Sequence, residues 1–248
     1  MLKFNGKVMK FGNVWGAAGS VTPPEPVIIV PSDMDFIYFA NSFDGSKIPN
    51  SAPNSTFGDY LKQGSLTLNG SGSAAYLTNG LSSSNYLYKD LTEAERTAMK
   101  AVYNTYTFFI RVMQDQSGVG GIISWRSDIN SKIYMIRAFN GQLELYTTQG
   151  YDCGSDFSLN TDRVYKVVVF GSSFKAYNLD NNAEYSLAYS NTRWMQNRMA
   201  SFNADLTSTS TMEAKLSRFY ALAGIPRATT AEEDANIKTA LMNQSIAV

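Results

Sequence analysis

Residues 105–113 read TYTFFIRVM, and residues 163–170 read RVYKVVVF. In the first stretch an extended chain places four apolar side chains on one face, those of Tyr106, Phe108, Ile110 and Val112. The second stretch alternates in the same way around valines, whose β-branched side chains favour strands. Both stretches are therefore predicted to be interior strands of a β-sheet.

Shorter segments of the same character lie on either side of these two stretches. Asn-Gly or Asp-Gly pairs, which supply the positive φ angles of tight hairpin turns, occur at residues 44–45, 69–70, 79–80 and 140–141. Strands joined by such turns run antiparallel, so the sheets are expected to be antiparallel. Further strands are predicted at residues 65–68, 74–77, 121–125, 132–138, 142–147, 173–179, 184–189 and 213–222.

Two helices are predicted from capping signals. Residues 92–95 (TEAE) form a capping box that opens a helix to about residue 103, and residues 230–233 (TAEE) open a second helix to about residue 243. The second helix has a narrow apolar stripe, made of Ile237, Ala240 and Leu241, which is typical of a helix lying on a larger body. The predicted fold is all-β, an antiparallel two-sheet sandwich with two short peripheral helices.

The N-terminal part of the chain has a different composition. Residues 2–11 read LKFNGKVMKF, which predicts a β-hairpin around the Asn-Gly pair, and residues 20–26 read SVTPPEP, which favours an extended spacer. We therefore divide the chain into an anchoring hairpin at residues 1–19, a proline-rich linker at residues 20–34 and a sandwich domain at residues 35–248. Because an isolated hairpin is marginally stable in water, residues 1–31 are predicted to attach the domain to another protein.

The composition excludes several classes of chemistry. The chain has 21 basic and 21 acidic residues, so its formal net charge is zero and neither nucleic acid nor an anionic membrane is an expected partner. It has no histidine, which excludes Ser-His-Asp and Cys-His catalysis and His-ligated zinc. Its single cysteine, Cys153, can form no internal disulfide. Lysines at positions 3, 7 and 10 and the absence of an apolar run there argue against a signal peptide.

Six segments carry a resemblance to a known superfamily. They read ANSFDG (residues 40–45), SLTLNG (65–70), YTFFIR (106–111), GIISW (121–125), NGQLEL (140–145) and LSRFYAL (216–222), and residues 229–237 follow the last as a short helix. In this order and spacing they resemble the concanavalin A-like, laminin-G-like jelly-roll superfamily in its single-domain bacterial or phage form, over residues 35–244. The resemblance implies a jelly-roll sandwich. The chain departs from the superfamily at residues 176–181 (AYNLDN), and no calcium-ligand set can be carried over from it.

A second resemblance concerns the N-terminus. Residues 2–13 resemble the short basic and aromatic hairpin that opens structural proteins of Bacteroidetes phages and prophages. This resemblance implies a protein carried in several copies, or as a homo-oligomer, on a virion or another assembled extracellular particle, after synthesis in the cytoplasm. The implied partners of residues 1–31 are other virion or assembly proteins.

The superfamily includes glycoside hydrolases, so paired carboxylates are the chemistry to look for. Its hydrolases carry Glu-x-Asp-x-Glu on one strand, and this chain has no such triplet. Glu93, Glu95 and residues 232–233 are predicted in first turns of helices, where acidic groups stabilise the helix dipole. Asp33 and Asp35 lie beside the linker, and a solvated role is expected for them. The sequence therefore predicts a protein that is not an enzyme; an enzyme with a diverged carboxylate pair is the alternative.

Candidate ligand-binding residues lie in polar loops. Trp194 is flanked by polar groups, and Tyr151 lies beside Asp152 and Asp156, so that aromatic rings and carboxylates could bind a sugar. The acidic loop could hold a ligand or calcium, but ordinary turn chemistry is the favoured explanation, and no metal site or cofactor is predicted. The predicted function is a structural or adhesion module that displays a sandwich domain toward a host-surface glycan, without membrane insertion. A purely architectural decoration protein remains an alternative.

Overall fold

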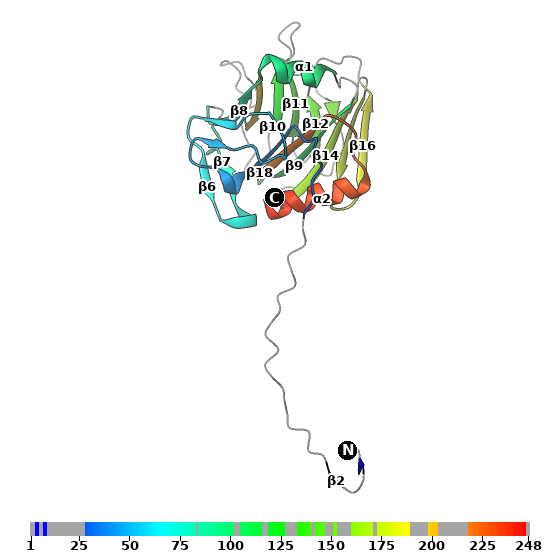
Figure 1. Ribbon diagram of the computed structural model, residues 1–248. Helices are drawn as coiled ribbons and strands as arrows, with labels where there is room; N and C mark the ends of the chain where they lie inside the picture. Colours follow the sequence, from blue (N-terminus) through cyan, green and yellow to red (C-terminus); the bar gives the residue numbers. More distant parts are fainter. Residues whose placement is uncertain are drawn as a thin grey trace.

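Two antiparallel sheets packed face to face form the body of the protein in the computed structural model (Figure 1). The structure describes residues 3–4, 7–8, 28–82, 84–101, 105–115, 119–126, 133–139, 142–146, 151–152, 160–170, 173–188, 198–202 and 218–246. The predicted all-β sandwich with two short helices and an N-terminal hairpin is confirmed. The hairpin pairs β1 (Lys3–Phe4) with β2 (Lys7–Val8).

The strands of each sheet follow one another in an order far from their order along the chain. Sheet I is ordered β13 (Tyr151–Asp152), β12 (Gln142–Tyr146), β11 (Ile133–Phe139), β10 (Val119–Arg126), β17 (Arg198–Phe202), β8 (Tyr86–Asp90), β5 (Tyr60–Gln63) and β4 (Lys47–Ile48). Sheet II is ordered β16 (Ala183–Ala188), β15 (Ser173–Asn178), β14 (Arg163–Phe170), β9 (Thr105–Met113), β18 (Arg218–Ile225), β7 (Tyr76–Thr78) and β6 (Thr67–Asn69), and β3 (Phe36–Phe39) also pairs with β18.

The two longest apolar stretches of the sequence lie side by side in sheet II. Strands β9 and β14 pair with Phe108 opposite Val167. Both residues face sheet I and belong to the core between the sheets, which also contains Ile136 and Met199 of sheet I. The alternation in residues 105–113 and 163–170 thus identified strands and also the face that each strand buries.

Helix α2 (Ala231–Asn243) covers the outer face of sheet II, the face turned away from the core (Figure 1). Its buried residues are Ile237, Ala240 and Leu241, as the narrow apolar stripe predicted. The predicted capping box is present: Thr230 accepts a hydrogen bond from the Glu233 backbone, and the Glu233 carboxylate accepts one from the Thr230 backbone. The local sequence therefore defines where α2 begins and which side it buries.

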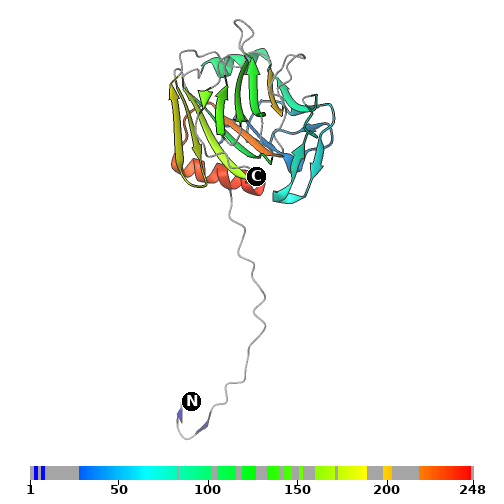
Figure 2. The ribbon, with the colours of Figure 1, turned by 180° about the vertical axis from the view of Figure 1, so that it is seen from behind.

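Helix α1 (Glu93–Ala101) lies at the opposite end of the body from α2 (Figures 1 and 2). It begins with the capping box predicted at residues 92–95, in which Glu95 and Thr92 exchange hydrogen bonds. Glu95 is also buried, and its Oε1 lies 3.0 Å from the Lys89 Nζ of strand β8. The buried ion pair attaches the first turn of α1 to sheet I.

The packed body begins by residue 28. Ile28, Val30 and Met34 are buried in one apolar cluster with α2 and the outer face of sheet II. We call residues 28–35 the strap. The strap lies mostly within the range 20–34 that was predicted to be linker.

Two of the predicted hairpin turns have another role. Asp44-Gly45 lies between β3 of sheet II and β4 of sheet I, and Asn79-Gly80 lies between β7 of sheet II and β8 of sheet I. Both pairs therefore carry the chain from one sheet to the other, and the hairpin prediction is wrong there. Their φ angles are still those that the pairs favour, because Gly45 and Gly80 have φ of +96° and +60°. At residues 69–70 the turn does join two paired strands, because Asn69 ends β6 and Gly70 leads toward its partner β7.

No described helix is both long enough and apolar enough to span a bilayer.

Candidate binding face

The predicted contact residues lie at one edge of sheet I or outside the described part of the chain. Tyr151 and Asp152 form β13, where their backbones pair with Leu145 and Glu144. Trp194 and Asp156 lie outside the described residues, as does Cys153. The ligand-binding role of Tyr151, Asp152, Asp156 and Trp194 stays a prediction.

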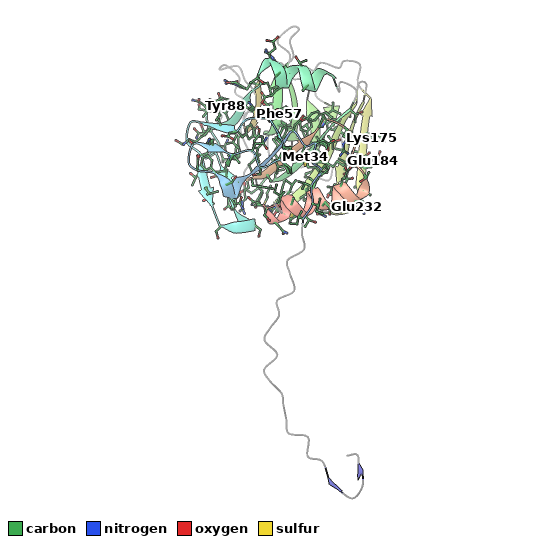
Figure 3. All side chains as sticks on the ribbon, in the orientation of Figure 1. Met34, Phe57, Tyr88, Lys175, Glu184 and Glu232 are labelled. Carbon is green, nitrogen blue, oxygen red and sulfur yellow. The ribbon has the colours of Figure 1, made fainter. Side chains whose placement is uncertain are left out.

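The outer face of sheet I, turned away from the core, carries a group of partly exposed side chains on β5, β8 and β17. Along β8 the buried Leu87 faces the core, so the neighbouring Tyr88 points outward. Tyr86, at the start of the strand, is partly buried against the core, and its ring lies beside that of Tyr88. The backbone register brings Leu61 of β5 opposite Tyr88 and Arg198 of β17 opposite Asp90. We call this group the Tyr88 patch; it consists of Leu61, Tyr86, Tyr88, Asp90 and Arg198, and Figure 3 labels Tyr88 at one flank of the body.

An arginine holds the patch together. The Arg198 guanidinium lies 4.4 Å from the centroid of the Tyr88 ring, a cation–π distance. It also donates two hydrogen bonds to Asp90, from Nε to Oδ1 at 2.6 Å and from Nη2 to Oδ2 at 2.9 Å. The hydrogen bonds to Asp90 raise the pKa of Arg198 above its usual value, against the opposing effect of burial. Arg198 is therefore a fixed cation whose charge is balanced by Asp90.

The patch is accessible to a ligand. The side chains of Arg198 and Asp90 are 35% and 57% exposed, and Leu61 is 37% exposed. The Tyr86 ring lies 6.0 Å from that of Tyr88, at an interplanar angle of 60°. Aromatic and apolar surface thus adjoins a planar set of hydrogen-bonding groups, which is the combination that a sugar ring with its hydroxyl groups requires.

Four of the carboxylates suspected of chemistry have structural partners. Glu95 and Glu233 belong to the capping boxes, as predicted. Glu233 also accepts hydrogen bonds from Arg227, which lower its pKa to about 2, and Arg227 binds Asp33 as well. The predicted solvated role is wrong for Asp35, which is partly buried and accepts a 2.7 Å hydrogen bond from Tyr106 Oη. Burial raises the pKa of Asp35 to about 6, against the lowering effect of that hydrogen bond.

Two acidic positions on different strands of sheet I, not connected by the sequence, lie opposite each other in the backbone register. The register of β12 and β13 places Glu144 opposite Asp152. The Glu144 side chain is buried and accepts a hydrogen bond from Arg137 of the neighbouring strand β11. This pair of positions could not be found by a search for carboxylates on a single strand, because each strand contributes one.

Within the part of the chain that the structure describes, no three cysteine or acidic side chains are grouped so that they could hold a metal ion.

Comparisons with known proteins find the fold but no family. No family model matches the sequence, and no curated protein matches it. Trypanosoma rangeli sialidase in complex with 2,3-difluoro-KDN is similar in structure, with a TM-score of 0.59 and 10% identity, over 86% of this chain and 33% of the sialidase. Domain 4 of an extracellular GH43 arabinanase from Geobacillus stearothermophilus, in complex with arabinotriose, gives a TM-score of 0.58 and 14% identity, over 83% of this chain and 98% of that domain.

A third similar structure comes from a toxin. The binding domain of botulinum neurotoxin serotype D/C gives a TM-score of 0.56 and 10% identity, over 86% of this chain and 52% of that domain. This chain therefore spans about a third of the sialidase and about half of the neurotoxin domain. At these identities the comparisons establish a shared β-sandwich fold, found in carbohydrate-active proteins and binding domains.

Proposed function

We propose that this protein is a non-enzymatic carbohydrate-binding module that binds a host-surface glycan through the Tyr88 patch. The observation that carries the proposal is the patch itself, in which two tyrosines and a partly exposed guanidinium–carboxylate pair lie on sheet I along β8 and β17. The corresponding face of sheet II is covered by α2 and the strap. The fold is shared with an arabinanase domain in complex with arabinotriose, which supports the proposal.

The test is glycan binding by a multivalent form, because a shallow patch of a few side chains binds weakly as a single copy. The protein is coupled in many copies to beads and applied to a panel of immobilised glycans. Tyr88→Ala is expected to reduce bead retention at least about tenfold. Full retention of correctly folded Tyr88→Ala beads would show that binding does not use the patch.

Sheet II offers a matched control for this variant. Tyr76 is a partly exposed tyrosine under an arginine, since the Arg218 guanidinium lies 4.6 Å from its ring centroid. Tyr76→Ala removes the same kind of aromatic and cation–π contact from the other sheet. We expect Tyr76→Ala beads to bind glycan as the unsubstituted protein does.

We further propose that the N-terminal segment that precedes the strap, within the predicted range 1–31, attaches the module to a phage or prophage virion, together with other assembly proteins. The support is the small size of the β1–β2 hairpin, whose strands have two residues each. A hairpin of this size gains stability by pairing with another protein. Attachment to a repeating assembly would supply many copies, and linked copies raise avidity by about 10²–10⁴ without new contacts.

A second candidate function is glycoside hydrolysis, favoured by the opposition of Glu144 and Asp152 on β12 and β13. Retaining glycosidases use two carboxyl groups about 5–5.5 Å apart. The ion pair of Glu144 with Arg137 favours a structural role for this side chain instead. Reproducible turnover of any glycan in the panel, abolished by Glu144→Gln, would replace the binding proposal with an enzymatic one.

A further inference from the structure

We infer that the Tyr88 patch selects neutral glycans that present two adjacent hydroxyl groups, and discriminates against sialylated or uronate-containing glycans. This inference rests on the proposed function and adds the chemical class of the ligand. It follows from three properties of the patch: its balance of charge, its arrangement of donors and acceptors, and its apolar border.

The charge of the patch is balanced. Arg198 is its cation, and both carboxylate oxygens of Asp90 accept hydrogen bonds from it. Two nearby lysines have partners of their own. Lys47 forms an ion pair of 2.6 Å with Asp59, and Lys62 lies over the Phe43 ring on the other side of β5. An acidic sugar would have to place its carboxylate beside that of Asp90 or displace Asp90 from Arg198, and both arrangements lose favourable electrostatic energy.

The donors and acceptors of the pair fit two neighbouring hydroxyl groups. Asp90 receives hydrogen bonds from Nε and Nη2, so Arg198 keeps Nη1 as a donor that this pair does not use. A carboxylate has about four acceptor sites, so Asp90 retains further lone pairs beside the guanidinium. A donor and an acceptor thus lie next to each other in one plane. One sugar hydroxyl can accept from Arg198 while its neighbour donates to Asp90.

The patch is rigid where the hydroxyl groups would bind. The Tyr88 ring supports one face of the guanidinium, and Asp90 fixes its orientation within the plane. A planar guanidinium held in this way loses little conformational entropy when it forms further hydrogen bonds. Leu61, opposite Tyr88, and the edge of Tyr86 supply apolar surface for the carbon face of the sugar ring.

The experiment compares each of two neutral glycans with an acidic relative. Beads carrying many copies of the full chain are applied to immobilised lactose and sialyllactose, and to galactan and polygalacturonate. We expect retention on the neutral member of each pair to exceed that on the acidic member by about tenfold or more, and to change little with ionic strength, since screening acts on charged partners. Equal or stronger retention on the acidic members would overturn the inference and leave the proposed function standing.

Substitution of the carboxylate tests the charge argument directly. Asp90→Asn leaves Arg198 with an unbalanced charge, so retention is expected to fall on neutral glycans and to rise on acidic ones. Glu184→Gln makes the same change in net charge by leaving Lys175 unpaired on sheet II, away from the patch, and is expected to leave the preference unchanged. A shift of preference in Glu184→Gln equal to that in Asp90→Asn would assign the effect to overall charge and overturn the inference.

A third variant, Arg198→Lys, tests the geometry of the pair, because lysine keeps the positive charge but cannot form the bidentate hydrogen bonds to Asp90. It is expected to lose retention on neutral glycans; full retention there would overturn the inference. Thermal unfolding of each variant shows that the body is intact. If the unsubstituted beads bind no glycan of either kind, the proposed function itself fails and the architectural alternative is favoured.

Discussion

Asp35 couples the stability of the protein to pH at the level of one residue. Its carboxyl group is partly buried and hydrogen-bonded to Tyr106, and its pKa is about 6 instead of the usual 3.8. The folded state therefore holds the proton more tightly than the unfolded state. The stabilisation is fully present below the unfolded pKa and is lost as the pH rises through about 6. At about 1.4 kcal/mol per pKa unit, the loss amounts to at most about 3 kcal/mol.

The prediction is that Asp35→Asn removes this loss. An asparagine oxygen can still accept the hydrogen bond from Tyr106, and it carries no charge at any pH. We expect the free energy of unfolding of the variant, relative to the unsubstituted protein, to rise between pH 4 and pH 7. Urea unfolding across this range measures it. Asp33→Asn is the control, because the hydrogen bond from Arg227 lowers the pKa of Asp33 and gives the opposite sign. Parallel pH profiles of Asp35→Asn and the unsubstituted protein would contradict the prediction.

At the scale of elements, the capping box of α2 is the clearest contribution of local sequence. Thr230→Ala removes the side-chain acceptor for the Glu233 backbone, which costs about 1 kcal/mol in typical helices. Thr239 lies exposed on the same helix and bonds only back to Ala235, so Thr239→Ala is a matched control with an expected change near zero. Thermal or urea unfolding distinguishes the two. Equal effects of both substitutions would show that the cap does not stabilise α2 in its docked position.

The elements that the sequence predicted share one property: their signals are local. Alternation over eight or nine residues revealed β9 and β14, and four-residue boxes revealed both helices. Strands β8 and β17 have five residues each and were not predicted. They become strands because they pair with each other and with their neighbours in the sheet. Such pairing between distant segments cannot be predicted from a local sequence pattern. For the same reason the turns at residues 44–45 and 79–80 were recognised as turns but not as crossings between sheets.

The candidate site could not be predicted from the sequence, for a related reason. Arg198 and Asp90 are separated by 108 positions in the sequence, and Tyr88 belongs to a strand that was not predicted. Ligand-binding aromatic residues were expected in polar loops, whereas the Tyr88 patch lies on the face of a sheet. Alternation along residues 86–90, with Leu87 inward and Tyr88 outward, was the signal that could have identified Tyr88.

At the scale of the whole molecule, the strap connects the N-terminal segment to the layer that covers sheet II. Asp33 receives two hydrogen bonds from Arg227, which also binds Glu233 at the start of α2. The Asp35 backbone donates to the Gly224 carbonyl of β18. At the other end of α2, Arg111 of β9 donates to the carbonyls of Leu241 and Met242. Both ends of the covering layer are therefore attached to sheet II by polar contacts.

This arrangement determines which N-terminal truncation the body tolerates. Removal of residues 1–27 leaves the strap in place, so the thermal midpoint is expected to stay nearly unchanged. Removal of residues 1–35 deletes Ile28, Val30 and Met34 from the cluster under α2, and each buried side chain of this kind contributes about 1.5–3 kcal/mol. It also deletes the partners of Arg227 and Tyr106. The longer truncation is therefore expected to lower the midpoint strongly.

The shorter truncation then separates folding from attachment. A chain that begins at residue 28 keeps its strap, its sheets and the Tyr88 patch, so in multivalent form on beads it should still bind glycan. If residues 1–27 carry the attachment element, the same chain should be missing from assembled particles, as measured by its amount in purified particles relative to the full-length protein. Normal incorporation of the truncated chain would place the attachment surface on the sandwich instead. A fall in its thermal midpoint comparable to that of the longer truncation would show that the hairpin belongs to the folded body.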